Sequence, residues 1–400
     1  RDFYYKYFDG RLFDIIEPKV RNVNPLLADE LVKSIKDEKI SKRFKDCSAT
    51  MKSFDGFLEK EVPSFTWNEN FKMAVEMVTE LLPNAHLKPL TIHRDMDISV
   101  NFSNLNASSG VISPRQTKRR QAKRIISIAK TMESEINSPT CGVDTWLPSL
   151  SFHRSQISRY VVNGKVNSDN IKYKDRLVWC IDAATVLIES KYARPIINAT
   201  SGVFKQYAGG LSHYDIRRYI NANCRGKSWV SLDFSSFDQT IPSWLIRSAF
   251  EILWQKYFPQ GNWNEKNWIC DRFINTYLIT LDGRLVQKHK GIPSGSYFTQ
   301  MIGSLCNMLM ILTYLFSTVP SRIKKRDKME YVQRVLSPVN DINSPSITML
   351  TMGDDNIVFT YGDLDLHELS SYLKRNFGTV VNPDKCETSR THKNPVFLKR

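Results

Sequence analysis

The sequence lacks most of the features that mark secreted, zinc-binding, repetitive or membrane-spanning proteins. Its seven cysteines are scattered and include no CxxC pair, which argues against a disulfide framework or a zinc module and indicates a reducing compartment. No internal repeat, low-complexity tract or secretory signal is visible. The longest apolar stretch, 301–319, contains Asn307 and several hydroxyl residues, which favours a buried core helix over a membrane span. A hydrophobic content of 42% over 400 residues predicts two or three packed regions.

Acidic residues are scarce relative to basic ones. The chain has 56 Lys and Arg residues against 41 Asp and Glu residues, a formal net charge of +15. Residues 101–350 hold 33 basic and 17 acidic groups, whereas residues 1–100 hold 16 and 17 and residues 351–400 hold 7 of each. This excess indicates an anionic partner, either nucleic acid or an anionic membrane surface. Because the basic residues do not follow one amphipathic helix, a membrane-surface role is disfavoured.

Apolar periodicity and turn residues predict both helices and strands. Two apolar runs flank Gly353-Asp354-Asp355-Asn356, which predicts a β-hairpin with an acidic tip. Pro242-Ser243 predicts the start of a helix. The other expected elements are helices at 71–82, 115–132 and 297–317, strands at 172–197 and 228–234, a turn-rich segment at 259–290 and a basic loop at 320–345.

The aspartates at the hairpin tip are the first candidates for chemistry. Adjacent carboxylates repel each other unless a cation binds, although Asp and Gly also favour an ordinary solvated turn. Asp233 ends another apolar strand and Asp238 follows it, a pattern that strand-end and helix-capping acids also give. Together these segments predict that Asp233 and Asp354 hold two Mg²⁺ ions, with Mn²⁺ as a substitute and Asp355 as an additional ligand. Two such ions stabilise the attacking and leaving oxygens of a phosphoryl displacement.

A Gly/Ser loop precedes the long apolar helix. In Ser294-Gly295-Ser296-Tyr297-Phe298-Thr299, glycine allows close backbone approach, and the hydroxyl groups together with Asn307 offer hydrogen bonds to a sugar. Alone, such a loop is usually a helix N-terminal cap. The ordered set Asp-x4-Asp, Ser-Gly-x3-Thr-x7-Asn and Gly-Asp-Asp is much more specific than any one of its parts.

With these motifs the sequence resembles viral RNA-dependent RNA polymerases. Residues 233–238 are similar to palm motif A of that family, residues 294–307 to motif B and residues 353–355 to motif C. The sequences of residues 291–300 and 240–246 are most similar to those of partitivirus-type enzymes of double-stranded RNA viruses, and next to those of picobirnavirus-like enzymes. The segments His153-Arg154-Ser155-Gln156 and Lys174-Asp175-Arg176-Leu177-Val178-Trp179 extend the likeness, which covers about residues 100–400.

The resemblance implies an α+β right-hand polymerase fold, with fingers and an antiparallel palm sheet flanked by helices. The chain lacks an initiator Met and ends at Phe397-Leu398-Lys399-Arg400, where motif E begins, so we expect a fragment whose thumb is largely missing. The implied division is an N-terminal region or fingers extension at 1–100, fingers at 101–225, palm motif A at 226–254, a fingers insertion at 255–290 and palm motifs B to E at 291–400.

The resemblance also implies roles for individual residues. Asp233 and Asp354 would bind metal with support from Asp355, and Asp238 with Asn307 would recognise the ribose 2′-hydroxyl. Ser294, Gly295 and Thr299 would shape the nucleotide loop. Lys174 and Arg176, with Lys191 and Arg194 as further candidates, would bind the triphosphate, although a basic run is usually a solvated face. Asn106, Ser108, Ser109 and Gly110 would border the RNA template, if they are not an ordinary polar loop, and Lys385 would donate a proton to pyrophosphate, if it is not a plain surface lysine.

The expected function is RNA-templated RNA synthesis from NTPs, in replication and transcription of a viral genome. Its partners would be the RNA template and product, the NTPs and, as a further candidate, a viral capsid protein, without a membrane. The expected location is the virion interior or the host cytoplasm. A reverse transcriptase shares the paired aspartates, but it needs a steric block where Asp238 and Asn307 are polar. A non-catalytic RNA-binding or capsid-associated protein would explain the charge and leave the ordered motifs unexplained.

Overall fold

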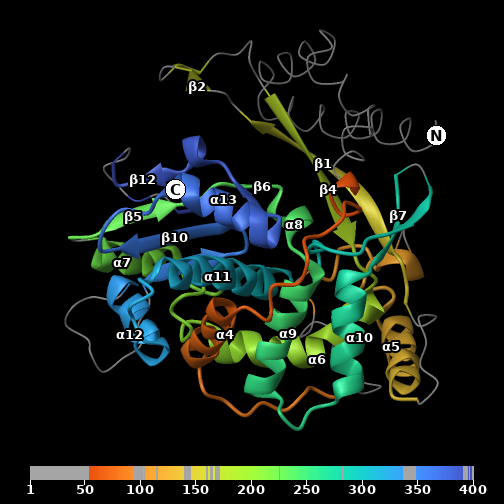
Figure 1. The fold of residues 1–400 in the computed structure, drawn as a ribbon. Helices are drawn as coiled ribbons and strands as arrows, with labels where there is room; N and C mark the ends of the chain where they lie inside the picture. The colour runs from red at the N-terminus through yellow and green to blue at the C-terminus, as the bar shows by residue number, and fades with distance from the viewer. Residues whose placement is uncertain are drawn as a thin grey trace. The chain divides into compact units, whose positions relative to one another are not determined.

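The computed structural model describes most of the chain beyond residue 53 (Figure 1). The described residues are 54–92, 102, 104–113, 116–138, 146–158, 161–162, 165–166, 172–224, 226–281, 283–336, 348–390, 395 and 397–398, with side chains left out at 153–176, 325–326 and 336. Two compact units are present: one comprises Arg1–Asp55, Ser151–Val178 and Ile279–Leu285, and the other Gly56–Leu150, Trp179–Leu278 and Val286–Arg400.

Among the described residues, the segments of the smaller unit belong, wholly or in part, to one four-stranded sheet and one two-stranded ladder. Four strands form one sheet in the order β4-β1-β7-β8, and a short antiparallel ladder pairs β2 with β3. These strands are β1 (Ser149–Ser158), β2 (Val161–Val162), β3 (Lys165–Val166), β4 (Lys172–Cys180), β7 (Tyr277–Ile279) and β8 (Leu285–Gln287). The strand expected at 172–197 is therefore confirmed only as far as Cys180. Helix α6 (Ala183–Thr200) follows because Asp182 caps it, accepting a hydrogen bond from the backbone N of Ala184 at 2.8 Å.

The larger unit is built around a second antiparallel sheet with the strand order β12-β5-β10-β9. The predicted acidic hairpin is confirmed, with Asn356 opposite Thr351 and Val358 opposite Met349. In the neighbouring ladder Val358 lies opposite Val230. The strands are β5 (Ser228–Ser231), β9 (Met349–Met352), β10 (Asp355–Thr360) and β12 (Glu387–Thr388), and a separate ladder pairs β6 (Phe234–Ser235) with β11 (Val380–Val381).

Helices cover both faces of this sheet. On one face Trp229, Leu350 and Phe359 pack with the inner side of α7 (His213–Asn223). On the other, Val230 and Val358 join the main hydrophobic core, which contains α11 (Thr299–Thr318). This alternation follows from the two-residue period of a strand. The remaining helices are α4 (Glu69–Leu81), η2 (Gly110–Ile112), α5 (Ala122–Ile136), α8 (Phe237–Thr240), α9 (Ser243–Tyr257), α10 (Trp263–Ile274), α12 (Lys325–Leu336), α13 (Leu366–Phe377) and η5 (Pro383–Lys385).

The apolar helix α11 is the centre of the core. It contacts α4, α9, α12, α13 and β9. By length and composition alone it is apolar enough to cross a membrane, but 89% of the stretch concerned is buried inside the structure. The expectation of a buried core helix is confirmed.

Two helices lie where the sequence predicted turns or a loop. Helix α10 occupies part of 259–290, and its cap is Asn262, whose side chain accepts hydrogen bonds from the backbone N of Asn264 and Glu265. Helix α12 occupies part of 320–345; Val332 on it is buried, and Glu330 pairs with Arg334 one turn later. The signal for α10 was present in the sequence, because the apolar pairs Ile269–Phe273 and Cys270–Ile274 stand at helical spacing, and all four residues are buried. The expected helix at 115–132 starts later, at Ala122.

Candidate active site

The backbone brings the predicted acidic residues to one edge of the larger sheet. Asn356 fixes the junction between β5 and β10: its Oδ1 accepts a hydrogen bond from the backbone N of Leu232 at 3.3 Å, and its carbonyl accepts one from Ser231 Oγ at 2.9 Å. Asp233 directly follows Leu232, and Asp355 directly precedes Asn356. Asp354, at the tip, is exposed, whereas Asp233 and Asp355 are half-buried. Two separate strands therefore present carboxylates at the same edge.

The donor chemistry at this edge suits a hard divalent cation, because carboxylate oxygens are the ligands that Mg²⁺ and Mn²⁺ prefer. Within the described ranges, no three His, Cys, Asp or Glu side chains are gathered closely enough to hold a metal ion. Carboxylates repel one another unless a cation lies between them. The residues therefore fit such an ion in chemistry and backbone placement, without forming a preassembled three-carboxylate cluster.

Helix α11 holds the hairpin tip through three residues. Ser304 Oγ accepts a hydrogen bond from the backbone N of Gly353 at 2.8 Å. The Asn307 side-chain amide donates to the carbonyls of Gly353 at 2.9 Å and Asp354 at 3.3 Å. A Cβ on Gly303 would lie 3.2 Å from Gly353 Cα, so the helix and the tip are in close contact. Asn307 is fully buried and its amide group holds the tip, while its Oδ1 has no hydrogen-bond partner among the described atoms. Its expected contact with a ribose 2′-hydroxyl stays a prediction.

The role of Asn307 predicts a measurable loss when it is shortened. Asn307→Ala leaves two partly buried hydrogen-bond acceptors, the Gly353 and Asp354 carbonyls, without their donor and should lower the free energy of unfolding by about 2–3 kcal/mol. The matched control is Asn376→Ala, which removes a single bond from a side-chain amide to the Tyr372 carbonyl. That control should cost about 1 kcal/mol in urea-induced unfolding. Equal losses in the two variants would contradict the assigned role.

The Gly/Ser loop is anchored at both ends. Ser294 Oγ accepts a hydrogen bond from the backbone N of Trp179 at 2.8 Å, and Thr299 Oγ1 donates to the Pro293 carbonyl at 2.6 Å. Gly295 has φ +90°, and a Cβ there would lie 2.8 Å from the Trp179 carbonyl oxygen. Only glycine tolerates both conditions without strain. All three expected residues thus set the loop's shape, while a contact of theirs with nucleotide stays a prediction.

Asp238 lies beside this loop. It is exposed on the single-turn helix α8, which follows Ser236 in the left-handed region at φ +51°. The Asp238 carbonyl accepts a hydrogen bond from the backbone N of Ile292 at 2.7 Å, and the Ile241 carbonyl accepts one from Gly291 at 2.9 Å. The first acidic motif and the Gly/Ser loop are therefore joined through their backbones.

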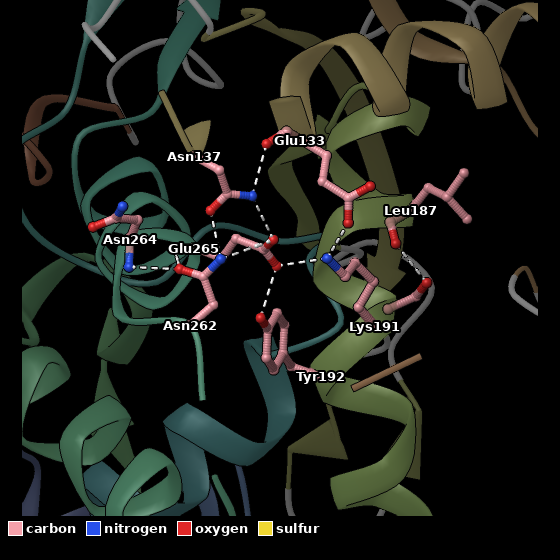
Figure 2. Close-up of polar contacts among 9 residues, drawn as sticks. Glu133, Asn137, Leu187, Lys191, Tyr192, Asn262, Asn264 and Glu265 are labelled. Atoms are coloured by element: carbon pink, nitrogen blue, oxygen red, sulfur yellow. Dashed lines mark hydrogen bonds and ion pairs between the residues drawn. The ribbon is translucent and has the colours of Figure 1, made fainter. Parts of the chain in front are cut away.

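The four cations expected to bind triphosphate have different placements. Lys174 and Arg176 lie on β4, and their side chains are outside the described part. Lys191 is buried and forms ion pairs with Glu133 and, at 2.7 Å, with Glu265 (Figure 2). Its ammonium group is therefore engaged inside the protein, contrary to the expectation that it binds triphosphate. Tyr192 also donates its hydroxyl hydrogen to Glu265. Arg194 lies close enough to Tyr297 in the Gly/Ser loop that it partly offsets the rise that burial causes in the pKa of the Tyr297 hydroxyl.

The loop expected to border the template divides into an exposed and a buried part. Asn106 is exposed and Ser108 half-buried, whereas Ser109 and Gly110 are buried. The Ser109 carbonyl accepts a hydrogen bond from the backbone N of Ala183 at 3.1 Å. Gly110 has φ +82°, and a Cβ there would lie 2.7 Å from Asp182 Cα. Ser109 and Gly110 thus dock the loop onto α6, which corrects the expectation that they contact RNA.

Asp182 at this junction predicts a pH effect on stability. Burial raises its pKa from 3.8 to about 6, partly offset by hydrogen bonds from the backbone N of Ala184 and Ile112 and by the charge of Arg272. The folded chain therefore binds more protons than the unfolded chain between about pH 4 and 6, so the contribution of Asp182 to stability declines as pH rises through that range. Relative to Asp182→Asn, the free energy of unfolding should decline by up to about 3 kcal/mol. The exposed Asp384→Asn should leave this slope unchanged.

Lys385 lies exposed in η5. Three residues before it, the backbone N of Asn382 donates a hydrogen bond to the Asp233 carbonyl at 3.0 Å. The pairing of β11 with β6 therefore holds this turn next to the first acidic strand. Its proposed proton transfer stays a prediction.

Several buried charges near the site were not singled out from the sequence. Glu189 accepts hydrogen bonds from the Gly/Ser loop, and Arg272 lies close enough to influence the charge of both Asp182 and Glu189. An acidic residue before or inside an apolar helix was the available signal. Lys288 is also fully buried, and its Nζ lies within hydrogen-bond distance of the backbone carbonyls of Phe273, Ile274, Lys290 and Gly291.

Known proteins match the chain in sequence. Residues 164–400 match the family described as viral RNA-dependent RNA polymerase. The RNA-directed RNA polymerase of Cryptosporidium parvum virus 1 is 33% identical over 145 residues, 34% of this chain and 26% of the relative, so the chain spans well under half of that relative. The genome polyprotein of Bovine enteric calicivirus NB is 24% identical over 355 residues, 81% of this chain and 14% of the polyprotein.

A solved structure matches the chain in fold. The crystal structure of an insertion-loop deletion mutant of a human picobirnavirus RNA-dependent RNA polymerase aligns with a TM-score of 0.61 at 16% identity, covering 98% of this chain and 70% of that one. This likeness shows the expected α+β right-hand polymerase fold. Residues 164–400, more than half of the chain, match the family in sequence, and the chain therefore belongs to the viral RNA-dependent RNA polymerases.

Proposed function

We propose that this chain carries the centre for RNA-templated RNA synthesis in a viral polymerase. The observation that carries the proposal is the backbone placement of Asp233, Asp354 and Asp355 at one sheet edge. Asn356 bonds the two strands there, and the Asn307 amide holds the hairpin tip. The exposed Asp238 beside the Gly/Ser loop supplies a polar partner for an incoming nucleotide.

The proposed reaction is attack of a primer or product 3′-hydroxyl on the α-phosphate of an NTP, with pyrophosphate leaving. Polymerases of this family use divalent metal ions, and here Asp233 and Asp354, supported by Asp355, would hold two Mg²⁺ or Mn²⁺ ions. The ions supply charge stabilisation for the attacking and leaving oxygens. Asp238 would accept a hydrogen bond from the 2′-hydroxyl, Lys174 and Arg176 would bind the triphosphate, and Lys385 would return a proton to pyrophosphate.

The proposed partners are the RNA template and product and the NTPs, with a viral capsid protein as a further partner and the virion interior or host cytoplasm as the location. The basic segment 101–350 supports an RNA partner, because Lys and Arg neutralise backbone phosphates. The proposed relationship to partitivirus-type enzymes is supported by the sequences of residues 291–300 and 240–246. The boundaries of fingers and palm given above belong to the same proposal.

The test is nucleotide incorporation on an RNA template with Mg²⁺, supplying either NTPs or dNTPs. Asp238 offers an acceptor for a 2′-hydroxyl, so NTPs should be preferred by at least about a hundredfold, since a site built for a hydroxyl leaves a polar group unpaired without it. Asp238→Ala should reduce this preference, while the exposed Asp384→Ala should not. Preference of the unaltered chain for dNTPs would instead indicate a reverse transcriptase.

A further inference from the structure

The Gly/Ser loop is held in its middle by a buried carboxylate from α6. Glu189 is 1% exposed. Its Oε2 accepts a hydrogen bond from Ser296 Oγ at 2.9 Å and another from the backbone N of Tyr297 at 3.0 Å. Ser296 Oγ in turn accepts one from the backbone N of Phe298 at 3.1 Å. One side chain therefore orders three successive residues of the loop.

The charge of Glu189 has a matching buried cation. Burial raises the pKa of Glu189, and the positive charge of Arg272, followed by the two loop hydrogen bonds, opposes that rise. Arg272 is 1% exposed; it donates from Nη2 to the Leu147 carbonyl at 3.3 Å, while its Nε and Nη1 have no hydrogen-bond partner among the described atoms. Arg272 thus favours the carboxylate by charge and leaves Glu189 Oε2 to the loop.

Helix α6 joins the loop to the rest of the site. In its first turn, the backbone N of Ala183 donates a hydrogen bond to the Ser109 carbonyl. Five residues beyond Glu189, Arg194 lies close enough to Tyr297 to influence the charge of its hydroxyl. Since α6 is buried along most of its length, it is a rigid support for both loops. The loop's ends are fixed separately through Ser294 and Thr299.

We propose that Glu189 is a positioning residue that holds Ser296 and Tyr297 in the loop conformation that receives the incoming NTP. The inference rests on the proposed function. It assigns to Glu189 no contact with nucleotide. Loss of the anchor should therefore weaken NTP binding more than it slows the chemical step, because the aspartates are held by other residues, Ser304 and Asn307.

Three variants of the full 400-residue chain test this assignment. Glu189→Ala removes both acceptor bonds, whereas Glu189→Gln keeps the volume and an acceptor oxygen without the charge. Glu265→Gln is the matched control, because Glu265 is also a buried glutamate bonded to a lysine and a tyrosine hydroxyl, in the network of Figure 2. Circular dichroism verifies that each variant is folded.

The first readout is amide hydrogen exchange at 296–298, which needs no activity. Exchange at Tyr297 should accelerate at least about tenfold in Glu189→Ala and less in Glu189→Gln, since bonds to a charged acceptor are the stronger ones. Glu265→Gln should leave it unchanged. Unchanged exchange at Tyr297 in folded Glu189→Ala would overturn the proposal. If that variant does not fold, Glu189→Gln decides by the same comparison.

The second readout is steady-state incorporation of NTPs. KM for NTP should rise about tenfold in Glu189→Ala with kcat within about threefold, and Glu189→Gln should restore part of the loss. Equal falls in kcat and kcat/KM, or a KM effect that Glu265→Gln reproduces, would overturn the positioning role. If the unaltered chain binds RNA and never incorporates nucleotide, the proposed function fails, while hydrogen exchange and NTP affinity still decide whether Glu189 sets the loop.

Discussion

Replacing Asp354 with asparagine should lower nucleotide incorporation by at least about a thousandfold while leaving RNA affinity within about threefold. The large effect is expected because Asp354 lies exposed at the tip, where its carboxylate would hold the ions that stabilise charge in the transition state, worth several kcal/mol. Asparagine keeps the size and removes the charge. RNA affinity should persist because it comes mainly from Lys and Arg side chains that neutralise RNA phosphates, whereas Asp354 is an acidic residue.

The matched control is Asp384→Asn, which neutralises another exposed aspartate in the larger unit, in η5. Single-nucleotide extension and a filter-binding or polarisation assay for RNA give the two quantities. A loss of activity shared by Asp384→Asn would indicate a general charge effect. Activity of Asp354→Asn within tenfold of the unaltered chain would remove Asp354 from the catalytic centre.

The second large effect is expected in stability, from Gly291→Ala. Gly291 has φ +78°, and a Cβ there would overlap the Asp238 carbonyl oxygen and lie 2.7 Å from the Phe57 ring. The left-handed backbone costs about 1–2 kcal/mol for a residue with a Cβ. Overlap with buried neighbours adds about 1–3 kcal/mol. The free energy of unfolding should therefore fall by about 3 kcal/mol or more.

Gly202→Ala separates the two causes. Gly202 has φ +73°, almost the same backbone, and nothing lies within 4 Å of an added Cβ. It should lose only the backbone part, about 1–2 kcal/mol, in urea-induced unfolding. If Gly291→Ala lowers the free energy of unfolding no more than Gly202→Ala does, the close approach of Gly291 to the Asp238 carbonyl is contradicted.

The motifs predicted the parts of the site that depend on local order. An apolar run, Gly353-Asp354-Asp355 and a second apolar run give a hairpin by turn chemistry alone, and β9 and β10 form it. The same holds for α11, whose apolar residues outnumber all others. Helix α10 was not predicted, although Ile269 and Phe273 are apolar at helical spacing; the Asn262 cap sets where it begins. Helix α12 begins and ends with charged and apolar residues intermixed, and no turn chemistry in its sequence marks it as a helix.

The roles of polar residues were harder to predict than their presence. Asn307 and Ser109 both belong to motif-like segments, yet the structure uses their polar groups to fasten one backbone segment to another. Lys191 pairs with two glutamates that are 58 and 74 residues away in sequence. Such partners are brought together only by the tertiary fold, so spacing along the chain cannot reveal which cation stays available for a ligand.

The central claim is that Asp233 and Asp354 share divalent ions at the sheet edge. The most direct measurement is a crystal structure of the chain with RNA, a non-hydrolysable NTP and Mn²⁺, with the manganese located by anomalous scattering. The account predicts two manganese ions that have carboxylate oxygens of Asp233 and Asp354, and oxygens of the triphosphate, among their ligands. Manganese bound to the triphosphate with neither aspartate as a ligand would contradict it.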